Sequence, residues 1–591
     1  METLSRLILN TVKSYPKDNF LSSKHDGRWI PLSTAEVGER IKAIALGLKE
    51  LGVARGDKLI ILSENRPEWH MTDFANLCLG GVTVPVYTSL MPDQIRYIID
   101  DSDAKVVVCS GLALWGRLAA VKGALSKVRH FIVMDGPAPE GALAMSDVIE
   151  KGRSVAALQP GLFEELAMSV KPDDLASIIY TSGTTGVPKG VMLTHGNFAS
   201  NVRTMTSLVE FNVKDTVLSF LPLSHVLERL TTFSFLAKGC SIAYAESIET
   251  VAENLLEVRP QIMVSVPRLF DKIYAKVMDT VLAGSSLKKA IFFWALKTGK
   301  KFSACRLERK PVPGFLKFKY GLARKLVFGK ILAKTGGRVR FFVSGGAPLS
   351  KDIAEFFFAI GLTILEGYGL TETAPVLAVN TFENLRPGTV GKPIPGIDLK
   401  IAADGEIVVR GPNVMRGYFK KEAETREVLI DGWLHTGDIG HLDKDGYLVI
   451  TDRKKDLIIT AGGKNVAPQP IENLLKTAPL IANAVVIGGN RKFIAALVVP
   501  DFDKLIAYAK ANAIPFTSRR ELVLRPEAVD FVMAGIERAT AQLAPFERVK
   551  KIALLDRDFE IEAGEMTPTL KVRRTIVENK YKDIIDALYK E

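Results

Sequence analysis

The sequence predicts an α/β fold, with a large N-terminal α/β domain that carries a β-rich subdomain and a small C-terminal α/β domain. The chain has 591 residues, which is too many for one hydrophobic core. Short apolar runs alternate with helical patterns through the first half, as in α/β proteins. From about residue 387 short strands with Gly and Pro turns follow, and after Asp452 an α/β pattern returns. We therefore predict domains at 1–452 and 453–591.

Each predicted strand is a short apolar run bounded by turn residues. In the N-terminal domain these runs are Lys58–Ser63, Val82–Tyr87, Lys105–Cys109, Ser177–Tyr180 and Val339–Val343. A helical pattern at Pro67–Leu79 separates the first two runs. In the C-terminal domain we expect a helix at Ile471–Thr477 and strands at Ala484–Ile487 and Phe493–Val499.

The composition excludes several classes of protein. Hydrophobic residues make up 47% of the chain and charged residues 24%, a balance typical of globular rather than disordered proteins. Four cysteines are scattered without a Cys-x-x-Cys pair, which argues against a disulfide framework or a zinc site. No apolar stretch reaches the ~20 residues of a spanning helix, and the N-terminus lacks the apolar core of a signal peptide. We expect a soluble, cytoplasmic protein.

The net charge of +12, from 78 basic and 66 acidic residues, is concentrated in residues 286–334. This basic window contains fourteen Lys and Arg against a single acid, Glu308, and it also contains eight aromatic residues. Such a window suits an anionic membrane surface, a nucleic acid or a solvated helical face. Because no nucleic-acid-binding module is recognisable there, we expect no nucleic-acid partner. We hypothesise peripheral contact with the inner face of a membrane.

The strongest local signal is a strand that leads into a loop of hydroxyls and glycines between Tyr180 and Gly190. The loop contains Thr181, Ser182, Gly183, Thr184, Thr185, Gly186 and Lys189. Glycines let backbone N–H groups turn toward one anion, hydroxyls add donors, and a lysine adds positive charge. The spacing differs from the GxxxxGK[ST] pattern of the P-loop. We interpret the segment as a phosphate-binding loop, with a flexible surface loop as the alternative.

This loop and five further motifs, in this combination, resemble the adenylate-forming superfamily, which includes acyl-CoA synthetases, luciferases and the adenylation domains of peptide synthetases. The further motifs are Ser344–Pro348 (SGGAP), Tyr368–Glu372 (YGLTE), Trp433–Asp438 (WLHTGD), Asp452–Asp456 (DRKKD) with Gly462–Asn465 (GGKN), and Pro568–Lys571 (PTLK). The resemblance covers roughly residues 20–580. It implies an ATP site with Mg²⁺ and a mobile C-terminal domain that rotates between two half-reactions.

The resemblance also implies roles for individual residues. It implies ATP binding by the loop residues given above and by Gly345, Gly346, Ala347, Gly367, Tyr368, Gly369, Thr371, Asp438 and Arg453. Lys571, His225 and Thr371 would be catalytic. Glu372 would be the Mg²⁺ ligand and Asp452 the hinge. The CoA path would be lined by Gly462, Gly463 and Lys464.

The segment Pro222–Arg229 (PLSHVLER) resembles the long- and very-long-chain fatty acyl-CoA synthetases, in which the residue at the position of His225 lies beside the acyl carboxylate. Glu366 stands where many relatives carry Gln, a difference that bears on the floor of the acyl pocket. We therefore expect an ATP-dependent long-chain fatty acid–CoA ligase that uses ATP, Mg²⁺ and CoA. The alternatives are a fatty acyl-AMP ligase that passes the acyl group to a carrier protein, and a lipid-binding or membrane-scaffolding protein.

Overall fold

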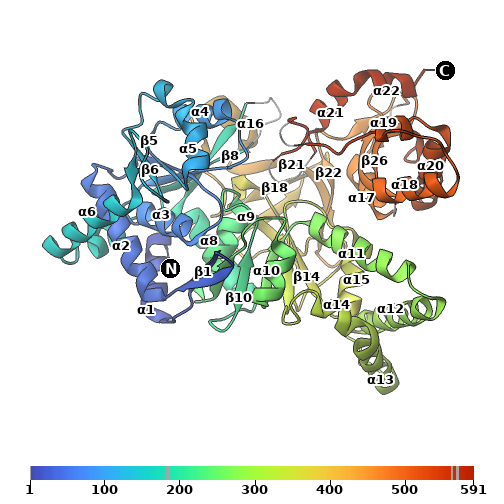
Figure 1. Ribbon diagram of the computed structural model, residues 1–591, viewed down its shortest axis with the longest axis horizontal. Helices are drawn as coiled ribbons and strands as arrows, with labels where there is room; N and C mark the ends of the chain where they lie inside the picture. The colour runs from blue at the N-terminus through green and yellow to red at the C-terminus, as the bar shows by residue number, and fades with distance from the viewer. Residues whose placement is uncertain are drawn as a thin grey trace.

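The computed structural model describes residues 2–181, 187–462, 464–478, 480–560, 563–567 and 572–590. Figure 1 shows a large body, coloured blue through yellow to pale orange, and a C-terminal lobe, coloured deeper orange and red. Helices α12 (Ser286–Leu307) and α13 (Gly314–Ala323) project from the body. None of the helices described is long and apolar enough to cross a membrane.

A nine-stranded sheet forms one half of the N-terminal domain. Its strands, in spatial order, are β16 (Lys392–Pro393), β15 (Val376–Val379), β14 (Thr363–Gly369), β13 (Phe341–Ser344), β12 (Ile262–Ser265), β10 (Thr216–Ser219), β11 (Ser241–Tyr244), β1 (Leu21–His25) and β2 (Arg28–Leu32). The central strands are parallel, and antiparallel pairs occur towards both edges. The predicted glycine turn at 345–347 follows β13, at the carboxyl end of a parallel strand, where open α/β sheets bind ligands.

An eight-stranded sheet forms the other half. Its strands, in spatial order, are β19 (Gly417–Tyr418), β9 (Lys189–Thr194), β8 (Leu175–Thr181), β4 (Val82–Val86), β3 (Lys58–Leu62), β5 (Ala104–Cys109), β6 (His130–Val133) and β7 (Leu143–Ala144). Strands β3, β4 and β5 are parallel and almost wholly buried, as their unbroken apolar sequences predict. Strands β8 and β9 are antiparallel, and their register places Thr181 opposite Lys189.

The predicted β-rich subdomain is a five-stranded sheet. It contains β17 (Asp398–Ile401), β18 (Glu406–Arg410), β21 (Trp433–Leu442), β20 (Leu429–Ile430) and β22 (Leu448–Arg453). The C-terminal lobe contains the hairpin β23 (Ile458–Ile459) and β24 (Asn465–Val466), and the sheet β25 (Ile481–Ile487), β26 (Ile494–Pro500) and β27 (Val549–Leu554).

Helices pack on these sheets in both domains. The remaining helices of the N-terminal domain are α1 (Leu4–Ser14), α2 (Thr34–Glu50), α3 (Pro67–Cys78), α4 (Pro92–Asp101), α5 (Leu112–Ala119), α6 (Met145–Leu158), α7 (Leu162–Ser169), α8 (His195–Leu208), α9 (Val226–Ala237), α10 (Val251–Val258), α11 (Pro267–Leu282), α14 (Gly329–Ala333), α15 (Lys351–Ile360) and α16 (Glu422–Val428). Those of the lobe are α17 (Pro468–Thr477), α18 (Phe502–Ala511), α19 (Arg519–Leu522), α20 (Pro526–Thr540), α21 (Arg574–Lys580) and α22 (Lys582–Leu588).

The α/β fold class is confirmed, and the predicted elements agree with the structure apart from their ends. The predicted strands correspond, in order, to β3, β4, β5, β8, β13, β25 and β26, and the predicted helices correspond to α3 and α17. The largest apolar cluster includes residues of both large sheets and of α8 and α9, for example Ile179, Phe198, Phe233 and Ile242. Helices α8 and α9 therefore connect the two halves of the domain next to the site described below.

Candidate active site

A cleft of about 2090 Å³ lies where the two large sheets, the β-rich subdomain and the C-terminal lobe meet. The predicted site residues that line it are Thr181, Lys189, His225, Gly345, Gly346, Ala347, Gly367, Tyr368, Gly369, Thr371, Glu372, Asp438, Asp452 and Arg453. These residues belong to motifs that are far apart in the sequence. The fold brings them to one site.

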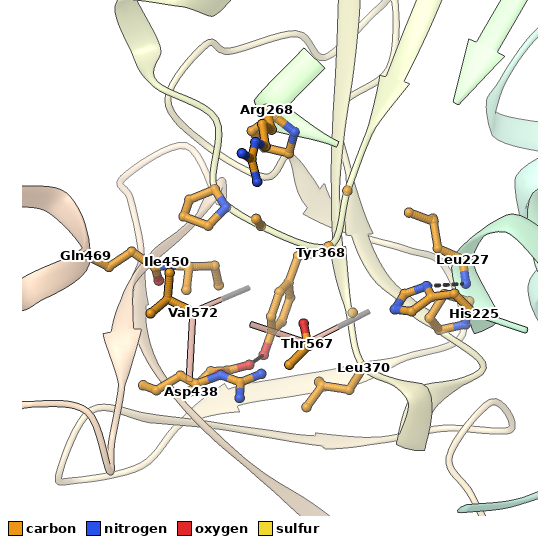
Figure 2. Close-up of a pocket in the computed structure, with 18 of the residues that line it drawn as sticks. His225, Leu227, Arg268, Tyr368, Leu370, Asp438, Ile450, Gln469, Thr567 and Val572 are labelled. Atoms are coloured by element: carbon orange, nitrogen blue, oxygen red, sulfur yellow. Dashed lines mark hydrogen bonds and ion pairs between the residues drawn. The ribbon is translucent and has the colours of Figure 1, made fainter. Parts of the chain in front are cut away.

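Two sets of predicted residues are not part of this lining. Gly462 and Lys464 do not line the cleft; Lys464 follows the β23 strand, with Nζ 5.8 Å from the centre of the Phe546 ring. The predicted residues that lie outside the described part of the chain are Ser182, Gly183, Thr184, Thr185, Gly186, Gly463 and Lys571. Thr567 and Val572, the described residues on either side of the PTLK motif, both line the cleft (Figure 2).

Tyr368 is held in the cleft by its hydroxyl group. The O–H donates to Oδ2 of Asp438 at 2.7 Å, and Oδ1 of Asp438 lies 3.4 Å from Nε of Arg453. Asp438 and Arg453 are partners in the register of β21 and β22, so the sheet sets their spacing. Burial, followed by the nearby Asp438 carboxylate, raises the pKa of Tyr368, so its hydroxyl stays protonated and remains a donor. Figure 2 shows this tyrosine with Asp438 at its hydroxyl end.

Glu372 is positioned by Tyr418, a residue that sequence reasoning missed. The Tyr418 O–H donates to Oε1 of Glu372 at 2.9 Å, and Nζ of Lys189 lies 5.2 Å from the centre of the Tyr418 ring. Tyr418 is in β19, which pairs with β9. No local pattern could have found it, because its partner is 46 residues away and the contact depends on the sheet.

The residues present fit an Mg²⁺–ATP site. Mg²⁺ commonly uses one or two carboxylates together with substrate phosphates and water, and Glu372 offers one carboxylate in the cleft. Within the described ranges, no group of three or more His, Cys, Asp or Glu could hold a metal ion alone. This donor set suits an ion that arrives with a phosphate ligand.

His225 precedes α9 and caps it. Its Nδ1 accepts a hydrogen bond from the N–H of Leu227 at 3.2 Å, so a neutral imidazole carries its proton on Nε2. Figure 2 shows His225 across the cleft from Asp438. A protonated Nε2 can donate to an anionic group bound between them.

Comparison with known proteins identifies the family. A family model described as "AMP-binding enzyme" matches residues 9–419, and a model described as "AMP-binding enzyme C-terminal domain" matches residues 455–591. The chain belongs to the AMP-binding enzyme family. This membership confirms the resemblance inferred from the motifs.

Relatives of this AMP-binding enzyme match over most of their length. The "Long-chain-fatty-acid--CoA ligase FadD15" of Mycobacterium tuberculosis is 37% identical over 95% of this chain and 93% of its own. The peroxisomal "Long chain acyl-CoA synthetase 6" of Arabidopsis thaliana is 33% identical over 96% of this chain and 82% of its own. Among solved structures, the anthranilate CoA ligase AuaEII in complex with anthranoyl-AMP has a TM-score of 0.75 at 20% identity, covering 99% of this chain and 98% of its own, which shows the shared fold.

In this AMP-binding enzyme a buried ion pair anchors the helix that begins after His225. Arg229 of α9 bonds Asp73 of α3 through Nη2–Oδ1 at 2.6 Å and Nε–Oδ2 at 3.0 Å, and both side chains are fully buried. Nη1 of Arg229 also donates to Oγ of Ser177 at 2.6 Å. Ser177 lies in β8, the strand that ends at Thr181. The ion pair therefore connects α3, α9 and the strand that enters the predicted phosphate-binding loop.

Glu366 does not line the cleft. Its neighbours in β14, Leu365 and Gly367, line the cleft, whereas Glu366 does not, as expected from alternating side chains in a strand. Burial raises the pKa of Glu366 to about 8. The AMP-binding enzyme can thus carry Glu here without placing a charge beside a bound acyl group.

Proposed function

We propose that this chain is an ATP-dependent ligase that activates a long-chain fatty acid to acyl-AMP and transfers the acyl group to CoA, releasing AMP and pyrophosphate. The observation that most supports this proposal is that one cleft is lined both by the polar cluster of Tyr368, Asp438 and Arg453 and by buried apolar side chains such as those of Phe211 and Phe235. The relatives named as long-chain fatty acid–CoA ligases also match nearly the whole chain.

In the first half-reaction a carboxylate oxygen of the fatty acid attacks the α-phosphorus of ATP, and pyrophosphate leaves with the electrons of the broken P–O bond. Lys189 and Lys571 neutralise phosphate charge, and Asp438 accepts hydrogen bonds from the ribose hydroxyls. Thr371 and His225 orient the reacting groups. A bound Mg²⁺ ion at Glu372 would supply further charge neutralisation on the phosphates.

In the second half-reaction the CoA thiolate attacks the acyl carbonyl carbon, and AMP leaves. We place the path of the thiol along Gly462, Gly463 and Lys464. Because Gly462 and Lys464 do not line the cleft in this structure, the C-terminal domain has to rotate to bring them to it. The same rotation would withdraw Lys571.

The proposed pivot is Asp452. Its Oδ1 accepts a hydrogen bond from the N–H of Arg453 at 2.7 Å, and its Oδ2 accepts one from the N–H of Gln469 at 3.2 Å. Gln469 lies in the first turn of α17, and Asp452 lies in β22. This one side chain therefore connects the last strand of the subdomain to the first helix of the lobe.

Asp452→Pro is expected to impair thioester formation from supplied acyl-AMP more than acyl-AMP formation from ATP. Proline fixes φ at the pivot, and a misplaced thiol path can cost on the order of 10²-fold in rate. The two half-reactions are measured separately by single-turnover kinetics. Asp452→Ala is the matched control, since it removes the side-chain contacts and leaves the backbone free to rotate. If proline slows both half-reactions equally, Asp452 is not the pivot.

The alternative function is a fatty acyl-AMP ligase that passes the acyl group to a carrier protein. The purified chain is incubated with ATP, Mg²⁺ and fatty acids of graded length, with and without CoA. The ligase should release pyrophosphate and form a CoA thioester in equal amounts. Pyrophosphate release that leaves acyl-AMP as the end product at saturating CoA would favour the alternative.

We also propose that the projecting helices of the basic window dock the enzyme on the inner face of an anionic membrane. Of the eight aromatic residues of the window, Phe292 and Phe328 are buried and Phe293, Phe315 and Phe318 are exposed, while the other three are half-buried. Among the aliphatic residues, Leu287, Leu322 and Leu326 are exposed, whereas Val327 and Ile331 pack on the core. Part of the apolar content is thus structural, and the rest lies on the outside among lysines and arginines.

Charge reversal of Lys317, Lys319, Arg324 and Lys325 to Glu should abolish co-sedimentation with anionic vesicles. Each basic side chain near such a surface contributes about 1 kcal/mol, so four to six of them give roughly 4–6 kcal/mol, and added salt should weaken the binding. The control reverses four exposed basic residues elsewhere, Lys49, Arg129, Lys151 and Lys171. Equal binding to neutral vesicles, or binding that salt does not change, would contradict attachment through charge.

A further inference from the structure

Part of the lining of the cleft is apolar, and we call this part the apolar branch. Six of the side chains that line it are Met205, Val209, Phe211, Phe235, Leu365 and Val379. All six are at least nine-tenths buried, and the rings of Phe211 and Phe235 pack edge to face with centroids 5.1 Å apart. Under the proposed function this branch holds the hydrocarbon chain of the substrate.

A second cavity of about 540 Å³ adjoins this branch. Three residues, Val209, Phe211 and Val379, line both cavities. The other residues that line the second cavity include Glu210, Lys238, Lys392 and the 45% exposed Phe382, so it is a surface groove with both charged and apolar lining. A single layer of side chains therefore separates the apolar branch from the groove.

The three shared residues form a wall whose backbone is fixed on both sides. Val209 caps the C-terminus of α8, and its N–H donates to the carbonyl of Met205 at 3.0 Å. Val379 ends β15 and pairs with Gly367 of β14. The backbone of Gly391 packs directly against that of Val379, since a Cβ at Gly391 would lie only 2.0 Å from the carbonyl carbon of Val379. Val379 therefore has no room to move towards Gly391.

We propose that the wall of Val209, Phe211 and Val379 sets the upper limit of acyl chain length, a specificity that rests on the proposed function. Each methylene buried in the branch should raise kcat/KM about fourfold, the equivalent of ~0.8 kcal/mol, until the chain reaches the wall. One further methylene has to displace a packed side chain or enter a groove at the surface, where it is less completely buried, so the gain in kcat/KM ends. Lengthening the acyl chain therefore raises kcat/KM only until the end of the chain reaches the side chains of Val209, Phe211 and Val379.

Phe211→Ala and Val209→Phe test the wall in opposite directions. The profile of kcat/KM against chain length is measured for each variant with a series of saturated fatty acids. Phe211→Ala removes part of the wall, so kcat/KM for an acid two carbons beyond the wild-type optimum should rise about fifteenfold relative to the optimum, two methylenes at about fourfold each. Val209→Phe places a larger side chain in the wall and should move the optimum to shorter acids. The ratio of kcat/KM between the shorter acid and the wild-type optimum should rise by a similar factor.

Phe382→Ala is the matched control, because this aromatic residue lines the groove and not the branch. It should leave the profile unchanged. For each variant, the kcat/KM values for different acids are compared as ratios, so a general loss of activity cancels. Superimposable profiles for all variants, or shifts of both wall variants in the same direction, would overturn the proposal. Failure of the proposed function would show differently, as the absence of a CoA thioester from every acid with the unmodified enzyme.

Discussion

Lys571→Ala is expected to abolish the formation of acyl-AMP from ATP and fatty acid while largely sparing thioester formation from supplied acyl-AMP and CoA. In the proposed mechanism the positive charge of Lys571 is needed while charge develops on the departing pyrophosphate, so its interaction acts in the first transition state. Removing one such donor typically costs about 10²–10³ in kcat. Single-turnover measurements of pyrophosphate release and of thioester formation follow the two steps separately.

Lys550→Ala is the control for Lys571→Ala, because Lys550 is an exposed lysine of β27 in the same domain. It should leave both half-reactions at the wild-type rate. Equal losses in the two half-reactions of Lys571→Ala would mean that this lysine does not act specifically in adenylation.

Arg229→Met is expected to lower the free energy of unfolding of the N-terminal domain by about 3–5 kcal/mol, because it leaves the Asp73 carboxylate buried without its cation. Ser177 would lose a donor at the same time. Urea unfolding, followed by tryptophan fluorescence, measures the change. The size of the effect follows from burial, since both side chains of the pair are 0% exposed.

Two further variants distinguish the loss of the buried ion pair from a general effect of removing an arginine. Arg410→Met removes one partner of an exposed pair, Arg410–Asp398, and should cost less than about 1 kcal/mol. The double variant Asp73→Leu with Arg229→Met should recover part of the loss, because two apolar groups replace two charges. If Arg229→Met lowers the free energy of unfolding no more than Arg410→Met does, the buried ion pair does not stabilise the domain as expected.

Several buried strands and part of the lining of the cleft could be predicted from the sequence. Runs such as those of β3 and β4 are buried on both faces of a sheet, and burial leaves a continuous apolar signal that needs no tertiary information. The motifs at 344–348 and 368–372 were recognisable because each contains several residues of one site in consecutive order. Their convergence with Asp438 was implied by resemblance, and the structure shows it.

The features that could not be predicted are contacts between residues distant in sequence. The hydrogen bond from Tyr418 to Glu372 depends on the pairing of β19 with β9, and the Arg229–Asp73 pair joins helices 156 residues apart. The aromatic residues of the basic window show the same limit, because composition does not distinguish the buried Phe328 from the exposed Phe318. Which side of a strand faces a cavity, as for Glu366, also depends on the packed sheet.

The proposed reaction activates the fatty acid through attack of its carboxylate on the α-phosphorus of ATP. The most direct measurement uses a long-chain fatty acid whose carboxylate carries the heavy isotope of oxygen, with ATP, Mg²⁺ and CoA. Mass spectrometry of the nucleotide product should find one labelled oxygen in AMP for each thioester formed, because the bridging oxygen of acyl-AMP stays with the phosphate when the thiol attacks the carbonyl carbon. Label in inorganic phosphate or pyrophosphate, or unlabelled AMP accompanying the thioester, would contradict this account.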